Sequence, residues 1–509
     1  MNDLVPKSLA EKMHQWKAAA KSWNPHPYQG RALKALLENG QYGLLLSPGM
    51  GKTSIVLATL KILTKKKLVH RALVVAPLRA IYDVWPAEVC DWKDFNGFSV
   101  ALLHGGNKDK VLRQLQPEHQ IVLINPEGFQ WLTSDKKRMK LLNADMLVVD
   151  ESSLWKSSTT RRFRCLRPYI PTFKRRVILT GSPRPRNYLD LFSQIYILDR
   201  GTALGQYITH YRNRFFFPTG YMQHEFEILP GAAEQINALV APMVLRLDAR
   251  DYLTLPKEME RTHRVELPPT ARKEYDNIEN NLMSTLFSAP MVNSAAARSK
   301  CCQIANGSVY TDSAGDQDAK WPVSKERPVK VIHTAKVDAV VDLYRELQGE
   351  QLLLAIGFKH DVDAIRRALG EDIPCIHGAT TRSQASDYID RWNRGKLDLL
   401  LGHPASMGHA LNLQKFNARH VGFFDISDNY DLYDQFFQRV CRQGNKALFV
   451  MKHHFVAQDT VDVAKMANLR RKCSGQAAFL QAMKDYAATR GYNAKGGIKS
   501  NAQEQRQRA

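Results

Sequence analysis

Residues 44–57, which read L-L-L-S-P-G-M-G-K-T-S-I-V-L, restrict the fold of this chain more than any other segment. A short apolar run ends at Pro48 and two glycines, and the residues from Lys52 onward have helical spacing. This order predicts a buried strand, a tight loop and a helix.

The glycine-rich loop predicts a nucleotide site. Gly49 and Gly51 allow backbone N–H groups to turn inward around a polyphosphate, and the N-terminus of the following helix adds partial positive charge. Lys52 then faces the β- and γ-phosphates, and the Thr53 hydroxyl can ligate Mg²⁺. Because Leu46 stands where a full P-loop has its first glycine, the pattern is the shorter G-x-G-K-T.

Polar residues elsewhere in the chain fit the same site. Gln29 precedes the loop, and its amide can donate and accept at once, which suits the edge of an adenine ring. An apolar strand expected at residues 146–149 runs directly into Asp150 and Glu151. We predict that Asp150 binds Mg²⁺ and that Glu151 orients or deprotonates the attacking water. Residues 180–183 end another strand and are expected to sense the nucleotide state.

Apolar strands alternate with amphipathic helices in two parts of the chain, which predicts two doubly wound parallel sheets of the α/β class. The strands are expected at residues 72–76, 100–103, 121–125, 146–149 and 177–179, and again at residues 352–357, 375–377, 397–402, 421–425 and 447–451. Between about residues 190 and 330 the alternation lapses, which favours helical insertions and an inter-domain connection. The predicted parts are an N-terminal lobe (1–230), a connector (231–335), a C-terminal lobe (336–470) and a basic tail that is partly disordered (471–509).

The second sheet has no phosphate loop, and its chemistry is expected in residues 435–444, which read Q-F-F-Q-R-V-C-R-Q-G. Arg439 and Arg442 are three apart on a helix predicted at residues 432–442, so they should project from one face. Two guanidinium groups supplied from the second sheet could neutralise the charge that develops on the γ-phosphate, as arginine fingers do.

The composition favours a polyanionic partner. The net charge is +22 and the isoelectric point is near 9.6, a balance typical of proteins that bind nucleic acid, although a merely solubilising basic surface is the alternative. Residues 207–217 mix bases with aromatic residues and either contact nucleic acid or bury their aromatic rings.

The same composition bounds where the protein acts. Seven cysteines without a C-x-x-C pair favour reduced thiols over a zinc site or disulfides. The sequence shows no signal peptide and no apolar run long enough to cross a bilayer. We therefore expect no membrane association and an intracellular protein, cytoplasmic or, in a eukaryote, nuclear.

Taken together, the order of motifs resembles that of superfamily-two helicases, specifically the Swi/Snf-type branch of ATPases, over about residues 26–462. The matching segments are P-H-P-Y-Q (25–29), V-V-A-P-L-R-A-I-Y-D-V-W-P-A-E (74–88), L-T-G-S-P (179–183), L-R-L-D-A-R-D-Y-L-T-L-P-K (245–257), H-G-A-T-T-R-S-Q (377–384), P-A-S-M-G-H-A-L-N-L-Q (404–414) and residues 435–444. The chain departs from the branch in its loop S-P-G-M-G-K-T, in Asp-Glu-Ser-Ser instead of Asp-Glu-Ala-His, and at His409. These departures make it similar to the compact DNA-annealing and phage-type members.

The resemblance implies two RecA-like lobes with helical insertions, the cofactors ATP and Mg²⁺, and a set of site residues. The implied catalytic residues are Lys52, Asp150, Glu151, Arg439 and Arg442, with Thr53 and Asp150 on the metal. The implied nucleotide contacts are Tyr28, Gln29, Pro48, Gly49, Met50, Gly51, Lys52, Thr53, Ser54, Gly408 and Gln435. The implied nucleic-acid contacts are Pro77, Arg79, Asn125, Glu127, Thr380, Arg382, Ser406 and Asn412.

Members of this branch usually move along duplex DNA without separating its strands. The resemblance therefore implies a DNA-stimulated ATPase that translocates on double-stranded DNA, of the remodelling or annealing type. Two alternatives stay open. A strand-separating DNA or RNA helicase would have the same ATPase core, and a non-catalytic scaffold could bind DNA through its charge alone.

Overall fold

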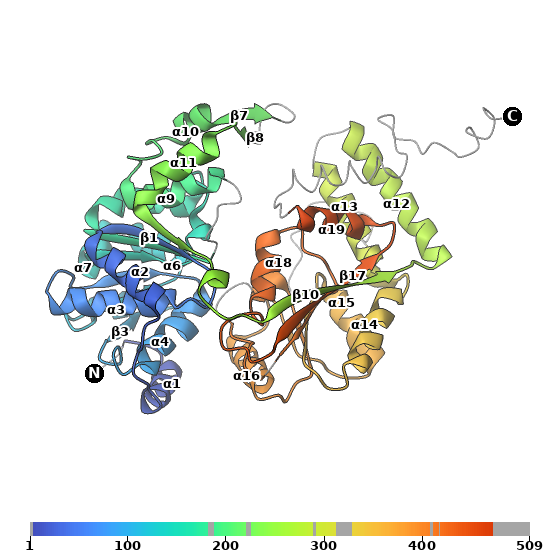
Figure 1. The fold of residues 1–509 in the computed structure, drawn as a ribbon, viewed down its shortest axis with the longest axis horizontal. Helices are drawn as coiled ribbons and strands as arrows, with labels where there is room; N and C mark the ends of the chain where they lie inside the picture. The colour runs from blue at the N-terminus through green and yellow to red at the C-terminus, as the bar shows by residue number, and fades with distance from the viewer. Residues whose placement is uncertain are drawn as a thin grey trace. The chain divides into compact units, whose positions relative to one another are not determined.

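The computed structural model describes residues 4–181, 188–219, 225–288, 292–311, 328–407, 411–416 and 418–471, without the side chains of residues 225 and 281–297. The chain divides into two compact units, Met1–Thr254 and Leu255–Ala509. Figure 1 colours the first unit from blue to green and the second from yellow-green to red. Each unit is built on one parallel sheet covered by helices, so the predicted α/β class is confirmed.

Unit 1 contains a seven-stranded sheet in the order β3-β4-β2-β5-β6-β1-β9, and every neighbouring pair is parallel. Its strands are β1 (Gln41–Leu46), β2 (Ala72–Val75), β3 (Val100–Leu102), β4 (Ile121–Ile124), β5 (Met146–Val149), β6 (Arg175–Thr180) and β9 (Val244–Leu247). Because all strands run the same way, their carboxyl ends lie along one edge, which is where such sheets bind ligands.

Helices pack on the sheet of unit 1 and bury its apolar side chains. The helices are α1 (Lys7–Ala18), α2 (Pro27–Glu38), α3 (Lys52–Lys65), α4 (Trp85–Asp91), α5 (Lys108–Arg113), α6 (Pro126–Thr133), α7 (Lys136–Leu142), α8 (Arg161–Leu166), α9 (Leu191–Asp199), α10 (Ile208–Phe215) and α11 (Ala232–Val240). Phe129 of α6 and Ile195 of α9 share one core cluster with Leu45 and Val149 of the strands. A hairpin of β7 (Phe216–Thr219) and β8 (Glu225–Ile228) stands outside this sheet.

Unit 2 contains a six-stranded sheet in the order β10-β17-β16-β13-β15-β14, again with parallel neighbours throughout. Its strands are β10 (Lys257–Val265), β13 (Leu352–Ala355), β14 (Cys375–Ile376), β15 (Leu399–Gly402), β16 (His420–Phe423) and β17 (Phe449–Ala457), and a separate hairpin joins β11 (Ser308–Tyr310) to β12 (Val329–Val331). Side chains alternate across β13, since Leu353 joins one core cluster and Leu354 the other.

The two faces of the second sheet are covered by different helices. The helices of unit 2 are α12 (Pro269–Ser288), α13 (Val292–Asn306), α14 (Ala335–Glu346), α15 (Lys359–Leu369), α16 (Arg382–Asn393), α17 (Pro404–Met407), α18 (Tyr430–Phe437) and α19 (Val461–Arg470). Val340 of α14 and Ile365 of α15 pack with Leu354, whereas Trp392 of α16 and Phe436 of α18 pack with Leu353.

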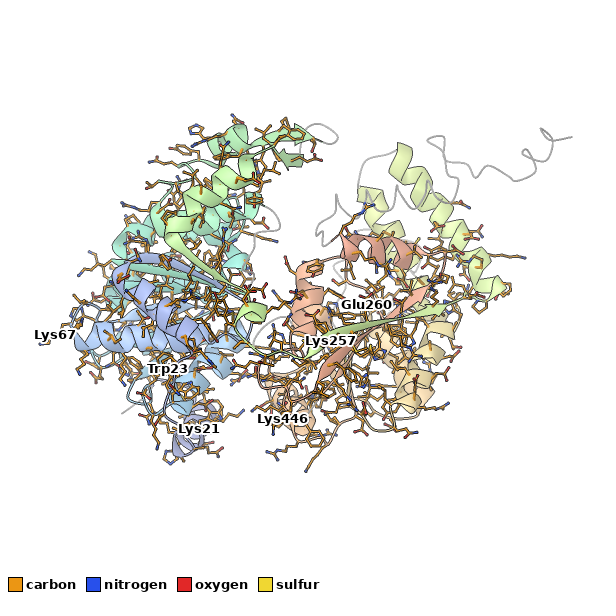
Figure 2. The ribbon with its side chains drawn as sticks, viewed as in Figure 1. Lys21, Trp23, Lys67, Lys257, Glu260 and Lys446 are labelled. Carbon is orange, nitrogen blue, oxygen red and sulfur yellow. The ribbon has the colours of Figure 1, made fainter. Side chains whose placement is uncertain are left out.

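Two strands lie where the sequence predicts only a connector. β9 pairs with β1 at the edge of the first sheet, and β10 pairs with β17 at the edge of the second, with Lys257 and Glu260 of β10 labelled in Figure 2. Charged residues interrupt the alternation of β10, and most of its side chains are exposed or half-buried, which is typical of an edge strand. The four-part division of the chain stays a prediction, but residues 244–265 contribute a strand to each sheet.

The helix predicted at residues 432–442 ends earlier than expected. The structure closes α18 at Phe437, so Arg439 and Arg442 lie in the turns that follow it and not on the helix. The amphipathic pattern continues to Val440 and Cys441 because these two side chains are also buried in the core, although their backbone is no longer helical.

Unit 2 contains a network of buried charged and polar side chains. The Lys336 ammonium group is fully buried and donates to the Asp462 carboxylate at 2.6 Å and to the Asn306 amide oxygen at 2.9 Å. Lys465, also buried, donates to Asp425 at 2.7 Å. Pairing of this kind is what allows charges to remain inside a fold.

Loss of one partner should therefore destabilise unit 2. In the Lys336→Met variant the Asp462 carboxylate keeps its burial but loses its cation, and we expect the free energy of unfolding to fall by about 3–5 kcal/mol. Hydrogen exchange of the core amides of unit 2 measures this change. The control is Arg391→Met, which removes an exposed ion pair to Asp387 and should cost less than about 1 kcal/mol. Equal losses in the two variants would contradict a stabilising role of the buried pair.

Candidate functional site

The loop after β1 has the backbone that a phosphate cradle requires. Gly49 and Gly51 have φ of 84° and 75°, a left-handed conformation that favours glycine, and Gly51 caps the N-terminus of α3. The Lys52 ammonium group lies over the loop and donates to the carbonyl oxygens of Leu46 at 2.8 Å and Ser47 at 3.3 Å. The first turn of α3 thus lies at the carboxyl end of β1, and it carries Lys52.

Gln29 ties helix α2 to this loop. Its buried amide nitrogen donates to the carbonyl oxygen of Met50 at 3.2 Å, and its amide oxygen accepts from the backbone N–H of His26 at 2.9 Å. A Cβ at position 51 would collide with the same amide, so the close approach also requires glycine there. The structure thus places Gln29 against the loop, and its contact with adenine stays a prediction.

Aromatic rings gather beside Gln29. The Tyr28 ring stacks on His26 at 5.4 Å between centroids and lies 5.5 Å from the ring of Tyr252. Arg31 holds Tyr252 through a hydrogen bond of 2.8 Å to its hydroxyl and lies over its ring. Tyr252 is 41% exposed, and it is a residue that the sequence analysis quoted within a motif but did not assign to the site.

The segment after β9 is anchored to the start of the loop. Ser47 donates its backbone N–H to the carbonyl oxygen of Leu247 at 3.3 Å, and its hydroxyl accepts from the N–H of Ala249 at 3.1 Å. On the other side, Pro48 lies 3.5 Å from the point where Gly181 would carry a Cβ. The loop is therefore bordered by residues 247–252 and by the end of β6. Residues 182 and 183 of the predicted sensor lie outside the described part of the chain.

Asp150 follows β5 and is held in a fixed orientation. Its carboxylate accepts from the indole N–H of Trp85 at 2.9 Å and from the backbone N–H of Glu151 at 2.9 Å. Burial raises the pKa of Asp150, and the Trp85 hydrogen bond and the positive charge of Lys52 oppose this rise. Asp150 follows β5 and Lys52 begins the helix after β1, so both lie at the carboxyl edge of the same sheet, and their joint action on a nucleotide stays a prediction.

Glu151 has a strained backbone. Its φ of 52° and ψ of 60° are left-handed values that a residue with a side chain rarely adopts and that are concentrated at functional sites. Its carboxylate accepts from the Ser153 hydroxyl at 2.6 Å, and Ser153 is the residue that replaces the usual histidine of this motif. The side chain is thus held next to Asp150 by a neighbour in the same turn.

Arg439 and Arg442 converge within unit 2. Their guanidinium groups both donate to the carbonyl oxygen of Leu411 at 3.4 Å, and Arg442 also donates to the side-chain oxygen of Asn412 at 2.6 Å. The predicted convergence on one side is thus present, although a turn and not a helix produces it. Asn412 accepts from Arg442 in this structure, and its contact with nucleic acid stays a prediction.

The remaining predicted nucleotide contacts are placed as follows. Thr53 and Ser54 are buried in the first turn of α3, and Met50 is buried in the loop. The main-chain oxygen of Gln435 accepts from Arg439 at 3.1 Å, while its side-chain oxygen is buried without a partner. Gly408 lies outside the described residues.

Of the four predicted nucleic-acid contacts of unit 1, Asn125 and Glu127 form bonds within the fold. The Asn125 side chain caps α6 through the N–H of Gly128 at 3.0 Å and donates to Glu127 at 2.7 Å. Glu127 also forms an ion pair with Arg162 at 2.6 Å. Burial lowers the pKa of Arg79, and the nearby Asp83 opposes that shift. Pro77 is buried as well.

In unit 2 the predicted nucleic-acid contacts follow strands of the sheet. The Thr380 hydroxyl donates to the carbonyl oxygen of Cys375 at 3.0 Å and so closes the turn after β14. Arg382 begins α16, and Ser406 lies in the short α17 after β15. These side chains lie at the ligand-binding edge of a parallel sheet, and their contact with nucleic acid stays a prediction.

The aromatic and basic segment at residues 207–217 mainly supports the core. Tyr211, Phe215 and Phe216 are buried, whereas Tyr207 is 53% exposed.

Within the described residues there is no cluster of three or more His, Cys, Asp or Glu side chains that could hold a metal. The described helices also include no membrane span. None of them is both long and apolar enough to cross a membrane.

Both units match known protein families. The SNF2-related domain matches residues 28–312, and the helicase conserved C-terminal domain matches residues 335–444. Putative protein p41 of Acyrthosiphon pisum secondary endosymbiont phage 1 is 30% identical over 482 residues, which are 91% of this chain and 99% of that protein.

Two other similarities are weaker. The DNA annealing helicase and endonuclease ZRANB3 of Mus musculus is 24% identical over 409 residues, which cover 74% of this chain but only 35% of that protein. The Sulfolobus solfataricus SWI2/SNF2 ATPase core in complex with dsDNA aligns with 91% of this chain and 94% of its own, at 20% identity and a TM-score of 0.40.

The hydrogen bond from Trp85 to Asp150 gives a testable prediction. A Trp85→Phe variant keeps an aromatic ring in the core but removes the donor that fixes the carboxylate. Hydrogen bonds to charged groups contribute about 1.5–3 kcal/mol, so the rate of nucleotide hydrolysis should fall roughly 10- to 100-fold. Steady-state kinetics measure the loss, and Trp131→Phe on the partly exposed side of α6 is the control. An unchanged kcat with a properly folded variant would exclude the positioning role.

Proposed function

Because this chain belongs to the SNF2-related family of helicase-like ATPases, as its motif order predicts, we propose that it is a motor that uses ATP hydrolysis to translocate on double-stranded DNA. The observation that carries the proposal is the arrangement at the carboxyl edge of the first sheet. There Lys52, in the first turn after the loop that follows β1, and the oriented carboxylate of Asp150, which follows β5, lie at the carboxyl ends of strands of one parallel sheet.

The protein groups at this edge fit a magnesium–nucleotide complex. Mg²⁺ prefers oxygen ligands and usually keeps several waters and phosphate oxygens, so it needs only one or two protein groups. The Thr53 hydroxyl in the first turn of α3 and the Asp150 carboxylate supply oxygen donors of this kind. When bound, the ion would neutralise phosphate charge, and Glu151 would orient the attacking water.

The second unit would contribute the two arginines. Arg439 donates to the main-chain oxygen of Gln435 at 3.1 Å, and Arg442 donates to the side-chain oxygen of Asn412 at 2.6 Å. The two arginines share the Leu411 carbonyl oxygen as an acceptor at a longer 3.4 Å. In the proposed cycle they leave these acceptors and contact the γ-phosphate, so that closure and opening of the units accompany hydrolysis.

The choice of duplex DNA rests on charge and on a relative. The chain carries a net charge of +22, which favours a polyanion. The mouse relative is named a DNA annealing helicase, which favours duplex DNA over RNA as the partner. The proposed contacts are Pro77, Arg79, Asn125, Glu127, Thr380, Arg382, Ser406 and Asn412. Such an enzyme would work in the cytoplasm, or in the nucleus of a eukaryote.

The first test concerns hydrolysis. Lys52→Ala and Glu151→Gln should each reduce kcat at least about 1,000-fold, because one removes a phosphate ligand and the other the group that orients water. Lys66→Ala, at the exposed end of the same helix, is the matched control and should retain full activity. ATPase activity that survives both substitutions would contradict the assigned site, and no activity with any nucleic acid would favour a binding scaffold.

The second test concerns the nucleic acid. ATP turnover is measured with duplex DNA, single-stranded DNA, forked DNA and single-stranded RNA of equal length. We expect duplex DNA to stimulate most, and the forked duplex to remain unseparated. Greater stimulation by single-stranded RNA would refute the DNA translocase, and separation of the fork would identify a strand-separating helicase.

Tyr252 provides a test of the nucleotide pocket. Its exposed ring lies beside Tyr28 and the loop, so it can stack on the base of the nucleotide. Tyr252→Ala should raise the KM for ATP about 5- to 20-fold with little effect on kcat, since stacking is worth about 1–2 kcal/mol in the ground and transition states alike. Tyr252→Phe should restore most of the affinity. The control is Tyr207→Ala, which removes an equally exposed ring far from the loop in sequence.

A further inference from the structure

Unit 2 contains a cavity that no part of the proposed motor uses. Its volume is about 730 Å³, within the range of small-molecule sites. Gln351, Arg419 and Lys446 line it, and they lie just before β13, β16 and β17. Since these strands are parallel, the cavity lies at the amino edge of the sheet, whereas Thr380 and Ser406 follow strands at the carboxyl edge. Lys446 is labelled in Figure 2, and Asn393, the last residue of α16, also lines the cavity.

The cavity has an excess of positive charge. Arg419 donates to the Glu350 carboxylate at 2.8 Å, and the same carboxylate contacts His420 at 2.6 Å. The Arg419 guanidinium lowers the pKa of Glu350 to about 2, so this carboxylate remains ionised and paired. The structure gives the exposed Lys415 and Lys446 no ion pair within the described residues. Two lysines thus remain for an anion.

Two amide oxygens at the cavity lack donors. Gln351 is 5% exposed and uses its amide nitrogen for the carbonyl oxygens of Trp392 and Leu397, which fixes its orientation. Its amide oxygen is buried without a hydrogen bond, and so is the amide oxygen of Asn393, whose nitrogen donates to Asn412. Buried acceptors of this kind need an N–H or O–H group from a ligand or from water.

An exposed aromatic ring completes the cavity. Phe416 is 57% exposed although it is a large apolar side chain, and its ring packs over the backbone of Gly395. Rings that are exposed next to lysines are the usual platforms for nucleobases, because every base has a face that stacks.

From these contacts we infer that the cavity is a second nucleotide site, in which Lys415 and Lys446 bind the phosphate, Phe416 stacks on the base, and Gln351 and Asn393 accept its N–H groups. The shared chemistry is a phosphate attached to a base with an amino group. A free mononucleotide and the end of a nucleic-acid strand both supply it. The binding itself does not depend on the proposed motor.

Photo-crosslinking of the full chain tests the inference. The probes are 8-azidoadenosine monophosphate and a 5′-phosphorylated single-stranded 10-mer with 5-iodocytosine at its 5′ end, and label at the loop that contains Lys52 is distinguished by its peptide. Mass spectrometry then maps the labelled peptide. We expect a label within residues 411–419, and Lys415→Glu with Lys446→Glu should reduce it at least tenfold. The matched control is Lys273→Glu with Arg367→Glu, which makes the same charge change on α12 and α15 and should retain the label.

A second variant separates recognition from charge. Phe416→Ala keeps both lysines and should reduce labelling about fivefold, with thermal melting as the check on folding. Labelling by only one probe would support the site and identify the source of its ligand. Absence of label from residues 411–419 with both probes, or label that survives the charge reversal, would overturn the site. ATPase activity measured without these probes tests the proposed motor separately.

Discussion

The nucleotide loop of unit 1 depends on hydrogen bonds that reach it from distant parts of the chain. Gln29, which lies on α2, donates to the carbonyl oxygen of Met50, and Ala249, which lies in the segment after β9, donates to the hydroxyl of Ser47. A glycine-rich loop loses more conformational entropy on folding than other segments, so such a loop needs partners of this kind to keep one conformation. The left-handed conformations of Gly49 and Gly51 are thus supported by contacts on both sides of the loop.

The second sheet is also parallel, but the N-terminus of the helix after its strand β13 is already bound by a side chain of the protein. After β13, the backbone N–H groups of Gly357 and Phe358 donate to the Asp361 carboxylate at 3.1 and 2.8 Å. A carboxylate of the protein thus occupies the N-terminus of α15, where a phosphate would otherwise bind. Gly357 also packs against Asp425, whose carboxylate pairs with Lys465. The N–H groups after β13 are thus already bound by a side chain of the protein, and the sequence that follows this strand lacks the glycine-rich loop of unit 1.

Sequence patterns predicted those parts of the fold in which one local signal decides the outcome. Buried strands such as β2 and β15 are continuous apolar runs, and each appears within a few residues of its predicted place. The edge strands β9 and β10 were missed because charged residues, the half-buried Arg246 and the exposed Glu260 among them, break the apolar pattern. The end of α18 was placed too late because burial of Val440 continues the apolar spacing beyond the last helical residue.

The residues of the candidate site likewise divide into those that local sequence predicts and those that it does not. The loop and the two carboxylates after β5 could be read from local sequence, since glycine spacing and a strand that ends in Asp-Glu are local signals. Trp85 and Tyr252 could not be assigned in this way, because their contacts join residues 65 and 221 positions apart in the chain. For Tyr252 the only local signal was a position inside a basic motif, which gives no distance to Arg31. Tertiary contacts of this kind require the folded backbone.

Asn412 connects the two activities of the proposed motor. Its side-chain oxygen accepts from Arg442 at 2.6 Å, and the same residue is expected to contact nucleic acid. If nucleic acid binds the side-chain amide of Asn412, this amide rotates toward its new partner. Its hydrogen bond to the guanidinium group of Arg442 then weakens. The contact of Arg442 to Leu411, at 3.4 Å, is longer and weaker than the bond to Asn412. In the proposed motor, nucleic acid at Asn412 would therefore weaken the short bond of 2.6 Å that holds the arginine, and this links the predicted nucleic-acid contact to the predicted catalytic residue within unit 2.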